Sequence, residues 1–597
     1  MRKTLLYNIL LIVIVVLAAG IRSINIGKFG LYGDEKYSLM VVNGISWEGA
    51  TQQEIFKRTE SGGLKTKYFT AKQFWDALSI SDVDEALIRT DNGNSSSYYA
   101  FLYVWKSIFG QTDGALRALG VVFDCLTIIL LFWFCKTILQ KPAVGLLAGF
   151  FAAIEPFMIA YSHQVRNYPM GIFFTLLSIY LFFKILKNET EKRPNFWNFM
   201  AYGFTILIAI LSHFYVVLFI FCQFILLVFR YLKNFSLVKK FTFTYVVSFS
   251  FLVLWFTIGS GRKTFSTLQE KDQIFRNMAE SVGAKSKEIS FVTTANFENI
   301  YNKIGPIFVD NFIISNDLMW KYTGKLNLIL CLILASILLL LFDLSKDEIL
   351  PKRNLKLLLL GIGISFLFSL LFSFNSLYYN YLALLFIFLV VLLRFYFQNK
   401  NWKFHFLEFS FITLLLPFMI TILAAIRAGH TANIYQKYLS FGFPISFIIV
   451  SLVLYQFWKQ KSYLAYLFLF GFGLFLSQIY VVDKHVLNDY YPKYTITENR
   501  KPNPYYGLAQ KIKSTYQPGD TIIYSNAGHT PFDKYDPQMA NDYVSVIDAQ
   551  LTNIYLPKNA EIIQRIDESE PNKVYLYQLV SRKKLLLFDF EGRKFRY

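Results

Sequence analysis

Two adjacent carboxylates, Asp34 and Glu35, have the residue types and the position best suited to chemistry in this sequence. They lie ten residues beyond an N-terminal apolar run that ends at Ile24. A carboxylate held at a membrane surface can take a proton from an acceptor hydroxyl. The pair therefore predicts an enzyme with its active site at a membrane boundary. The alternative is that the two residues only cap a helix, because acidic side chains favour helix N-termini.

A second polar segment, residues 162–169, reads Ser-His-Gln-Val-Arg-Asn-Tyr-Pro and links two apolar runs. Pro169 suits the first turn of the helix that follows. The guanidinium of Arg166 matches phosphate oxygens through two parallel hydrogen bonds, so this segment predicts phosphate binding. A local salt bridge or a lipid head-group anchor is the alternative reading of Arg166.

Three further polar features lie at or inside apolar runs. The basic segment 427–438 contains Lys437, and His213-Phe214-Tyr215 stands at a short turn, where a lone histidine beside aromatic rings is more often structural. Asp124 and Glu155 lie inside apolar runs, and charged groups there usually face the interior of a helix bundle. We expect Glu155 to be a buried hydrogen-bond partner.

The elements that must position these residues are membrane helices. Of the 597 residues, 54% are hydrophobic and 17% are charged, against roughly 25% charged residues in soluble domains. The fold class is therefore an α-helical polytopic membrane protein, and we expect the N-terminal run to remain as its first helix. At about 20 apolar residues per span, the sequence predicts about thirteen spans, at residues 5–24, 114–136, 142–160, 169–187, 197–212, 213–230, 241–259, 325–343, 355–374, 379–397, 405–426, 438–457 and 463–481.

Basic residues set the predicted orientation. The net charge of +20 arises mostly from Lys and Arg in alternate short loops between the apolar runs, which is typical of cytoplasmic loops. Nucleic acid is therefore not expected as a partner, whereas membrane lipids and a lipid phosphate are. With the N-terminus in the cytoplasm, an odd number of spans places the C-terminus outside a plasma or inner membrane.

Three long segments then face outward: the first loop at about 25–113, a second at about 260–324, and the C-terminal residues 482–597. The short segments that carry Arg166, His213 and Lys437 are predicted to face the same side. We expect residues 1–481 to form the transmembrane domain and 482–597 a small soluble α/β domain. Its predicted elements are a helix at 506–516 and strands at 521–524, 574–577 and 584–588.

Residues 98–109 of the first loop predict an amphipathic helix, with Tyr99, Leu102, Tyr103 and Ile108 available to the membrane interface. The four cysteines lie in or beside apolar runs without metal-ligand spacing. There is also no Walker loop, dinucleotide fingerprint or zinc spacing, so a nucleotide-sugar site of the soluble type is not indicated.

Taken in order, these segments resemble the GT-C superfamily of integral membrane glycosyltransferases, in particular the branch that contains protein O-mannosyltransferases and the lipid A aminoarabinose transferase. The matching segments are Asp34-Glu35 after the first span, Phe109-Gly110 leading to Arg117, Pro156 with Tyr161-Ser162 and Arg166-Asn167-Tyr168, His213-Phe214-Tyr215, and Lys437-Tyr438-Leu439. Two departures affect substrate identity more than reaction type. Ser95–Tyr99 stands where relatives often carry His-x-Pro-Leu-Tyr, and Lys437 replaces the more usual Arg.

The resemblance implies an inverting glycosyltransferase that moves a sugar from a polyprenyl-phosphate-linked donor to a lipid, glycan or protein acceptor on the outer face. Asp34 would be the general base, and Glu35 would orient the acceptor or the donor. The donor phosphate would be bound by Arg166, Lys437 and Arg117. The implied substrate-binding residues are His163, Tyr168, His213, Tyr215, Tyr98, Tyr99 and Tyr438.

No cofactor is required by this reading. A divalent cation is left open, because Asp34 and Glu35 are the oxygen ligands that hard cations take. Two other functions are left open as well: a polysaccharide polymerase or O-antigen ligase with related substrates, and a lipid-carrier transporter or flippase. A transporter is less favoured because the sequence shows no clear inverted repeat and no clear Gly/Pro-broken helices at the midplane.

Overall fold

The computed structural model describes residues 2–45, 54–58, 63–91, 93–282, 292–314, 403–459, 482, 501–526, 544–592 and 594–596. The predicted spans at 325–343, 355–374, 379–397 and 463–481 lie outside these residues.

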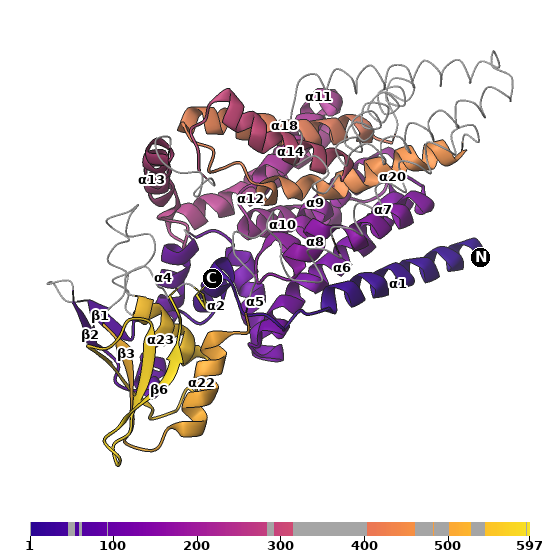
Figure 1. The fold of residues 1–597 in the computed structure, drawn as a ribbon. Coiled ribbons are helices and arrows are strands. Elements are labelled where there is room, and N and C mark those ends of the chain that lie inside the picture. Colours follow the sequence, from indigo (N-terminus) through magenta and orange to yellow (C-terminus); the bar gives the residue numbers. More distant parts are fainter. Residues whose placement is uncertain are drawn as a thin grey trace, which may run out of the picture.

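Apolar helices form a bundle that makes up most of the molecule (Figure 1). They are α1 (Arg2–Ser23), α6 (Asp113–Thr137), α7 (Pro142–Ile154), α8 (Pro156–Ser162), α9 (Tyr168–Thr190), α10 (Phe196–Ser212), α11 (Val216–Tyr231), α12 (Phe235–Thr257), α18 (Phe406–Ala428) and α20 (Phe443–Lys459). Within the described residues, six helices are long and apolar enough to span a membrane, or seven if the bent pair α7–α8 counts as one span. The chain is therefore a multi-pass membrane protein, but the predicted number of thirteen spans is not confirmed.

The first helix is joined to the bundle by a buried ion pair. Arg22, near the end of α1, donates from Nε to Asp124 Oδ2 over 3.0 Å and from Nη1 to the Ala153 carbonyl over 2.7 Å. Both charged side chains are almost fully buried. Charges in an apolar interior are tolerated when they are paired and hydrogen-bonded. Asp124 thus faces the bundle interior, as predicted.

Glu155 lies at the 58° bend between α7 and α8. Its side chain accepts a hydrogen bond from the Phe157 amide over 3.2 Å and so caps α8. Pro156 occupies the first position of α8, where its missing N–H costs nothing. The prediction that Glu155 is a buried hydrogen-bond partner is confirmed.

Shorter helices outside the bundle come from the predicted external segments. They are α2 (Gly33–Val41), α3 (Ala71–Asp76), α4 (Ile80–Asp91), α5 (Ser96–Phe109), α13 (Thr264–Val282), α14 (Phe297–Ile313) and α19 (Gln436–Leu439), the last followed by the short 3₁₀ turn η1 (Ser440–Gly442).

The predicted amphipathic helix is present as α5, but its faces differ from the prediction. Tyr103 and Ile108 are exposed, as expected, whereas Tyr99 and Leu102 are buried against the protein. The exposed apolar face consists of Phe101, Tyr103, Val104, Ile108 and Phe109. Tyr99 and Leu102 stand three residues apart, so they share the opposite face of the helix.

The C-terminal part contains a four-stranded sheet in the order β4-β3-β5-β6. β3 (Thr521–Ser525) pairs in parallel with β4 (Ile563–Asp567) and antiparallel with β5 (Lys573–Tyr577), which pairs antiparallel with β6 (Lys584–Asp589). Helices α22 (Pro504–Thr515) and α23 (Val544–Ile554) accompany it. The predicted helix and all three predicted strands are confirmed. β4 escaped prediction because its sequence, Ile-Gln-Arg-Ile-Asp, has no apolar run.

The first external loop packs directly on this C-terminal sheet. The hairpin of β1 (Phe56–Arg58) and β2 (Leu64–Thr66) lies beside β3 in Figure 1, and the segment that follows β2 pairs with β4. The Gln564 amide donates to the Phe69 carbonyl over 2.8 Å, and Thr70 forms a bridge with Ile563. Residues separated by almost 500 positions therefore form one layer beside the bundle.

Candidate active site

Helix α2 places the two carboxylates predicted from the sequence. Tyr32 is its N-cap in an extended conformation, and Glu35 Oε2 accepts a hydrogen bond from the Tyr32 amide over 3.1 Å. This arrangement is a capping box, in which the third helical residue returns to the cap. Glu35 therefore caps α2, which is one part of the capping alternative.

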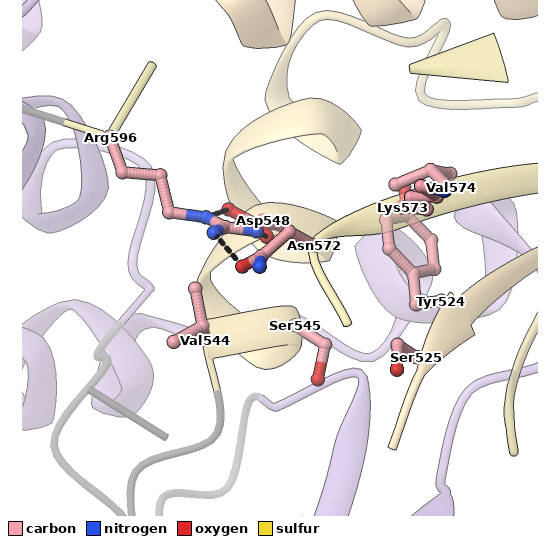
Figure 2. A pocket seen from close by; sticks show the side chains of 9 residues that line it. All are labelled: Tyr524, Ser525, Val544, Ser545, Asp548, Asn572, Lys573, Val574 and Arg596. Carbon is pink, nitrogen blue, oxygen red and sulfur yellow. Dashed lines mark hydrogen bonds and ion pairs between the residues drawn. The ribbon is translucent and has the colours of Figure 1, made fainter. Parts of the chain in front are cut away.

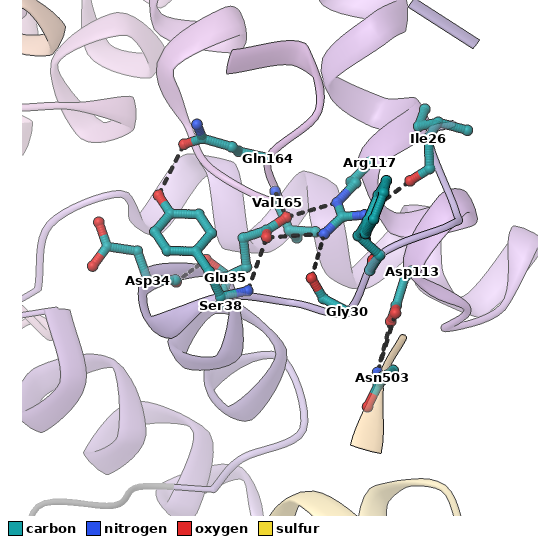
Figure 3. A network of polar contacts seen from close by, with 12 residues as sticks. Ile26, Gly30, Asp34, Glu35, Ser38, Asp113, Arg117, Gln164, Val165 and Asn503 are labelled. Atoms are coloured by element: carbon teal, nitrogen blue, oxygen red, sulfur yellow. Dashed lines mark hydrogen bonds and ion pairs between the residues drawn. The ribbon is translucent and has the colours of Figure 1, made fainter. Parts of the chain in front are cut away.

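The Glu35 carboxylate also forms a buried ion pair with Arg117 of α6 (Figure 3). Arg117 Nε donates to Oε1 over 2.8 Å and Nη2 to Oε2 over 3.0 Å, and the Val165 amide donates to Oε1 over 2.8 Å. The remaining Arg117 donors reach the carbonyls of Ile26, Phe29 and Gly30. All five N–H donors of the guanidinium are thus engaged.

These contacts revise the predicted roles of Glu35 and Arg117. Arg117 has no donor left for a donor phosphate, and the oxygens of Glu35 are occupied by Arg117, Tyr32 and Val165. Asp34 and Glu35 therefore do not fit a shared divalent-cation site. Among the described residues, no group of three or more His, Cys, Asp or Glu side chains is arranged to hold a metal. Glu35 and Arg117 instead fix α2 against the bundle.

Glu35→Gln is expected to lower the free energy of unfolding by about 3–5 kcal/mol, because it leaves the buried Arg117 guanidinium without its counter-charge. Denaturant unfolding of the purified protein in detergent measures this loss. The matched control is Glu85→Gln, which breaks the partly exposed Glu85–Arg89 pair one turn apart on α4 and should cost only about 0.3–0.5 kcal/mol. Equal losses in the two variants would contradict the structural role of Glu35.

Asp34 points away from the Glu35–Arg117 pair (Figure 3). Its side chain is 35% exposed, and its Oδ2 lies 3.6 Å from Lys437 Nζ. Burial by itself would raise the pKa of Asp34, but the nearby charges of Lys437 and Arg166 outweigh burial and hold this pKa below its usual value. Asp34 is thus an ionised and accessible carboxylate at neutral pH.

Arg166 lies in the turn between α8 and α9, close to α2. Its Nη1 donates to the Asp34 main-chain carbonyl over 3.2 Å and to Ser38 Oγ over 3.4 Å. The residue is only 9% exposed, and its Nε is buried with no hydrogen-bond partner among the described residues. A buried donor without a partner costs free energy, and an acceptor atom of a ligand at Arg166 Nε would remove that cost.

Lys437, in α19, also lies close to Asp34 and is surrounded by aromatic rings. Its Nζ is 5.5 to 5.8 Å from the ring centroids of Tyr168, Tyr435 and Tyr438. Such rings hold a cation through their electron-rich faces. Tyr438 in turn stacks on Tyr215 at 4.7 Å between centroids.

His213 lies within the same aromatic cluster. Its ring centroid is 5.5 Å from that of Tyr168 and 5.4 Å from that of Tyr438. Burial, with the positive charges of Arg166 and Lys437, lowers the pKa of His213 to about 3. The imidazole is therefore neutral. The structure brings together four of the predicted substrate-binding residues: Tyr168, His213, Tyr215 and Tyr438.

The other three predicted substrate-binding residues make different contacts. His163 Nε2 donates to the Arg22 carbonyl over 2.7 Å, which joins the turn after α8 to the end of α1. Tyr98 is buried in α5, and the Tyr99 hydroxyl donates to Asp91 Oδ2 over 2.8 Å. A substrate contact of these residues stays a prediction.

Asp91 is the residue near the site that sequence reasoning missed. Burial raises its pKa, and the opposing influences include the charge of Arg166 and the hydrogen bond from Tyr99. Gly93 follows at φ +69°, where an added Cβ would lie 2.4 Å from the Ser260 carbonyl oxygen. The sequence feature that could have pointed to Asp91 is Asp-Asn-Gly-Asn at residues 91–94, which is typical of a turn. This turn sequence stands directly before Ser95–Tyr99, the segment that departs from the family pattern.

A second overlooked residue is Lys271 of α13. Its positive charge acts to lower the pKa of both Asp34 and Asp91, although burial still leaves the pKa of Asp91 raised. The site therefore contains two carboxylates under the influence of three cations, Arg166, Lys437 and Lys271. That balance favours an anionic ligand.

One known protein family matches part of the chain. Residues 98–258 match the family of dolichyl-phosphate-mannose-protein mannosyltransferases. The matched segment runs from α5 to α12 and includes Arg166 and His213, but not Asp34 or Lys437. It confirms the predicted resemblance to the protein O-mannosyltransferase branch of membrane glycosyltransferases.

No curated protein sequence matches the chain significantly. Among solved structures, it is similar to the oligosaccharyltransferase of Archaeoglobus fulgidus in its apo form, with 12% identity, a TM-score of 0.41 and coverage of 86% of this chain and 58% of that one. The same enzyme with an inhibitory peptide and a dolichol-phosphate gives 12% identity, a TM-score of 0.41 and coverage of 87% and 59%. The chain thus spans less than two thirds of the length of these structures.

Proposed function

We propose that this protein is an inverting glycosyltransferase that moves a sugar from a polyprenyl-phosphate donor to an acceptor hydroxyl on the outer face of the membrane. The observation that carries the proposal is an ionised carboxylate, Asp34, whose side chain lies 3.6 Å from Lys437 and whose main-chain carbonyl accepts a hydrogen bond from Arg166, near the ends of membrane helices. The family match over residues 98–258 supports it. The acceptor is a lipid, a glycan or a protein.

The chemistry follows from the placement of these charges. The acceptor oxygen forms a bond to the anomeric carbon while the bond from that carbon to the phosphate oxygen breaks. Asp34 accepts the acceptor proton. The lipid phosphate leaves with additional negative charge, which Arg166 and Lys437 stabilise. A single displacement inverts the anomeric carbon and needs no covalent sugar–enzyme intermediate.

Donor binding would also adjust the base. In the free protein the charges of Lys437 and Arg166 lower the pKa of Asp34 and so weaken its basicity. A bound phosphate would neutralise part of that positive charge and raise the pKa of Asp34 toward its ordinary range. The base would become stronger only when the donor is in place.

The lowered pKa of Asp34 predicts the acid side of the pH profile. A base with a depressed pKa stays ionised as the pH falls, so kcat/KM should hold from pH 8 down to about 5 and decline only near or below the ordinary carboxylate value of about 4. Initial rates of the purified protein across this range measure it. Lys437→Met removes the neighbouring charge and should move the decline to higher pH. A wild-type midpoint above about pH 6 would contradict the assignment.

Mass analysis of the cell envelope tests the proposed function as a whole. Lipids, glycans and proteins from cells with the wild-type protein are compared with those from cells with Asp34→Asn. A mass difference of one sugar on an acceptor is expected, and it names the sugar and the acceptor together. Accumulation of a whole polymer on its carrier would favour a polymerase or ligase. A change only in the location of the lipid carrier would favour a transporter.

A further inference from the structure

Helix α2 carries three consecutive charged residues that face three different parts of the molecule. Asp34 faces Lys437, Glu35 pairs with Arg117, and Lys36 approaches the C-terminal unit, residues 501–526 and 544–596. Successive side chains on an α-helix are rotated by about 100°. Contacts to Glu35 and Lys36 therefore fix the rotation of α2 about its axis, and that rotation sets the direction of Asp34.

Lys36 is buried at its contact with the C-terminal unit. It is 7% exposed, and its Nζ lies 5.4 Å from the ring centroid of Tyr505 in α22. Burial lowers the pKa of Lys36 to about 8, while the negative charge of Asp548 acts in the opposite direction. Burying an ammonium group is costly unless an opposite charge or an aromatic face compensates. The aromatic face of Tyr505 and the larger of the two compensating negative charges, that of Asp548, belong to the C-terminal unit, and the smaller one is that of Glu35 in α2.

The surface that receives Lys36 is rigidly built. Asp548 of α23 is 2% exposed and accepts hydrogen bonds from Arg596 Nη2 over 2.6 Å and Nε over 3.1 Å (Figure 2). The Tyr505 hydroxyl also donates to Asp548 over 3.3 Å. The ring that contacts Lys36 and the carboxylate whose charge acts on it are thus joined to each other, and the carboxylate is also held by Arg596. Arg596 is near the C-terminal end of the chain, which lies beside α2 in Figure 1.

The same unit is docked at two further points next to α2. The Gly30 amide, three residues before α2, donates to the Lys501 carbonyl over 2.8 Å. Asn503 Nδ2 donates to Asp113 Oδ1 over 2.9 Å at the start of α6 (Figure 3). One turn further along α6 is Arg117, which clamps Glu35. The C-terminal unit therefore contacts the segment that leads into α2 and the start of α6, the helix whose Arg117 pairs with Glu35 of α2.

We propose that Lys36 is a positioning residue that couples the docked C-terminal unit to the orientation of the Asp34 carboxylate. This inference rests on the proposed function, in which Asp34 accepts the proton. It assigns the C-terminal unit a part in turnover: the unit holds α2 in the rotation at which Asp34 faces the acceptor.

The test uses Lys36→Met in the full-length protein in membranes. We expect kcat to fall by about 10- to 100-fold, because small displacements of a reacting group reduce rates by such factors. The KM for the donor should stay nearly unchanged, since Arg166 and Lys437 keep their places. Lys36→Arg retains the cation and should restore most of the rate. Asp548→Asn should lower kcat in the same direction, and the double variant should lose less than the product of the two single effects.

Lys106→Met is the matched control. Lys106 of α5 is a partly buried lysine near α2, where its Nζ donates to the Val42 carbonyl over 2.8 Å and to Asn43 Oδ1 over 2.9 Å just after the helix ends. It has no part in the Lys36 contact with Tyr505 or in the electrostatic interaction of Lys36 with Asp548. Its loss should reduce stability and leave kcat nearly unchanged. If Lys106→Met lowers kcat as much as Lys36→Met, or if Lys36→Met retains the wild-type kcat, the positioning role is wrong.

Amide hydrogen exchange separates this inference from the proposed function. Exchange at residues 37–42 should accelerate in Lys36→Met and return to the wild-type rate in Lys36→Arg, whatever reaction the protein catalyses. If the wild-type protein transfers no sugar, the proposed function fails, and exchange alone decides whether Lys36 couples α2 to the C-terminal unit. Unchanged exchange in Lys36→Met would overturn the coupling even in an active glycosyltransferase.

Discussion

Asp34→Asn is expected to reduce sugar transfer by about 10²- to 10⁴-fold, the usual contribution of a positioned general base. The amide has nearly the shape of the carboxylate but cannot accept the acceptor proton. The fold should be retained, because Asp34 is partly exposed and its side-chain ion pair with Lys437 spans 3.6 Å. The same substitution removes negative charge beside Arg166 and Lys437, so donor binding should be maintained or strengthened.

Transfer in proteoliposomes with a polyprenyl-phosphate sugar measures this effect, and thermal unfolding checks the fold. Asp84→Asn is a matched control, because Asp84 has a similar side-chain exposure of 36% and pairs with Arg262 at 2.9 Å. It should leave transfer unchanged. Near-normal transfer by Asp34→Asn, or an equal loss in Asp84→Asn, would reject Asp34 as the base.

Arg166→Ala is expected to reduce transfer by about 10²- to 10³-fold, as is typical when one group that stabilises developing negative charge is removed. Arg166 is the guanidinium near Asp34 that has a buried, unpartnered Nε in the described part of the chain. Arg117, in contrast, has all its donors engaged. The loss should therefore appear in both kcat and donor affinity.

Competition between the donor and free polyprenyl phosphate measures the affinity part of this prediction. Arg166→Lys keeps the charge but not the paired donors of the guanidinium, so its loss should be intermediate. Arg262→Ala, which removes an external arginine paired with Asp84, should leave competition unchanged. Unaltered rate and affinity in Arg166→Ala would exclude a phosphate-binding role.

Part of the site could be predicted from the sequence because it depends on the order of the spans. Loop charges placed Asp34, Arg166 and Lys437 on one side of the membrane, and the structure brings these three residues together. The roles of the two neighbouring carboxylates could not be separated in this way. Adjacent helical residues point in different directions, and the partner of Glu35 lies 82 positions away in α6. Only the packing of α2 against α6 shows that Glu35 is structural.

The C-terminal sheet and its helices also contain elements that local sequence patterns predict and one that they do not. Local patterns were sufficient for α22, β3, β5 and β6, whose apolar residues recur at helix or strand spacing. β4 was missed, because its pairing with β3 and with residues near Thr70 arises from contacts distant in sequence. The boundary at residue 482 stays a prediction, although the first external loop shares the C-terminal sheet.

The segment at Phe69–Thr70, which runs along β4, bears on how the protein avoids aggregation at high density in a membrane. An uncovered edge strand presents unpaired amides and carbonyls that can recruit a strand from a neighbouring molecule. The first loop occupies that edge at β4. The opposite edge of the described sheet is β6, where Leu585 and Leu586 are exposed directly after Lys583 and Lys584. Lysines in this position discourage edge-to-edge pairing. We therefore expect Lys583 and Lys584 to protect the β6 edge from pairing with a neighbouring molecule.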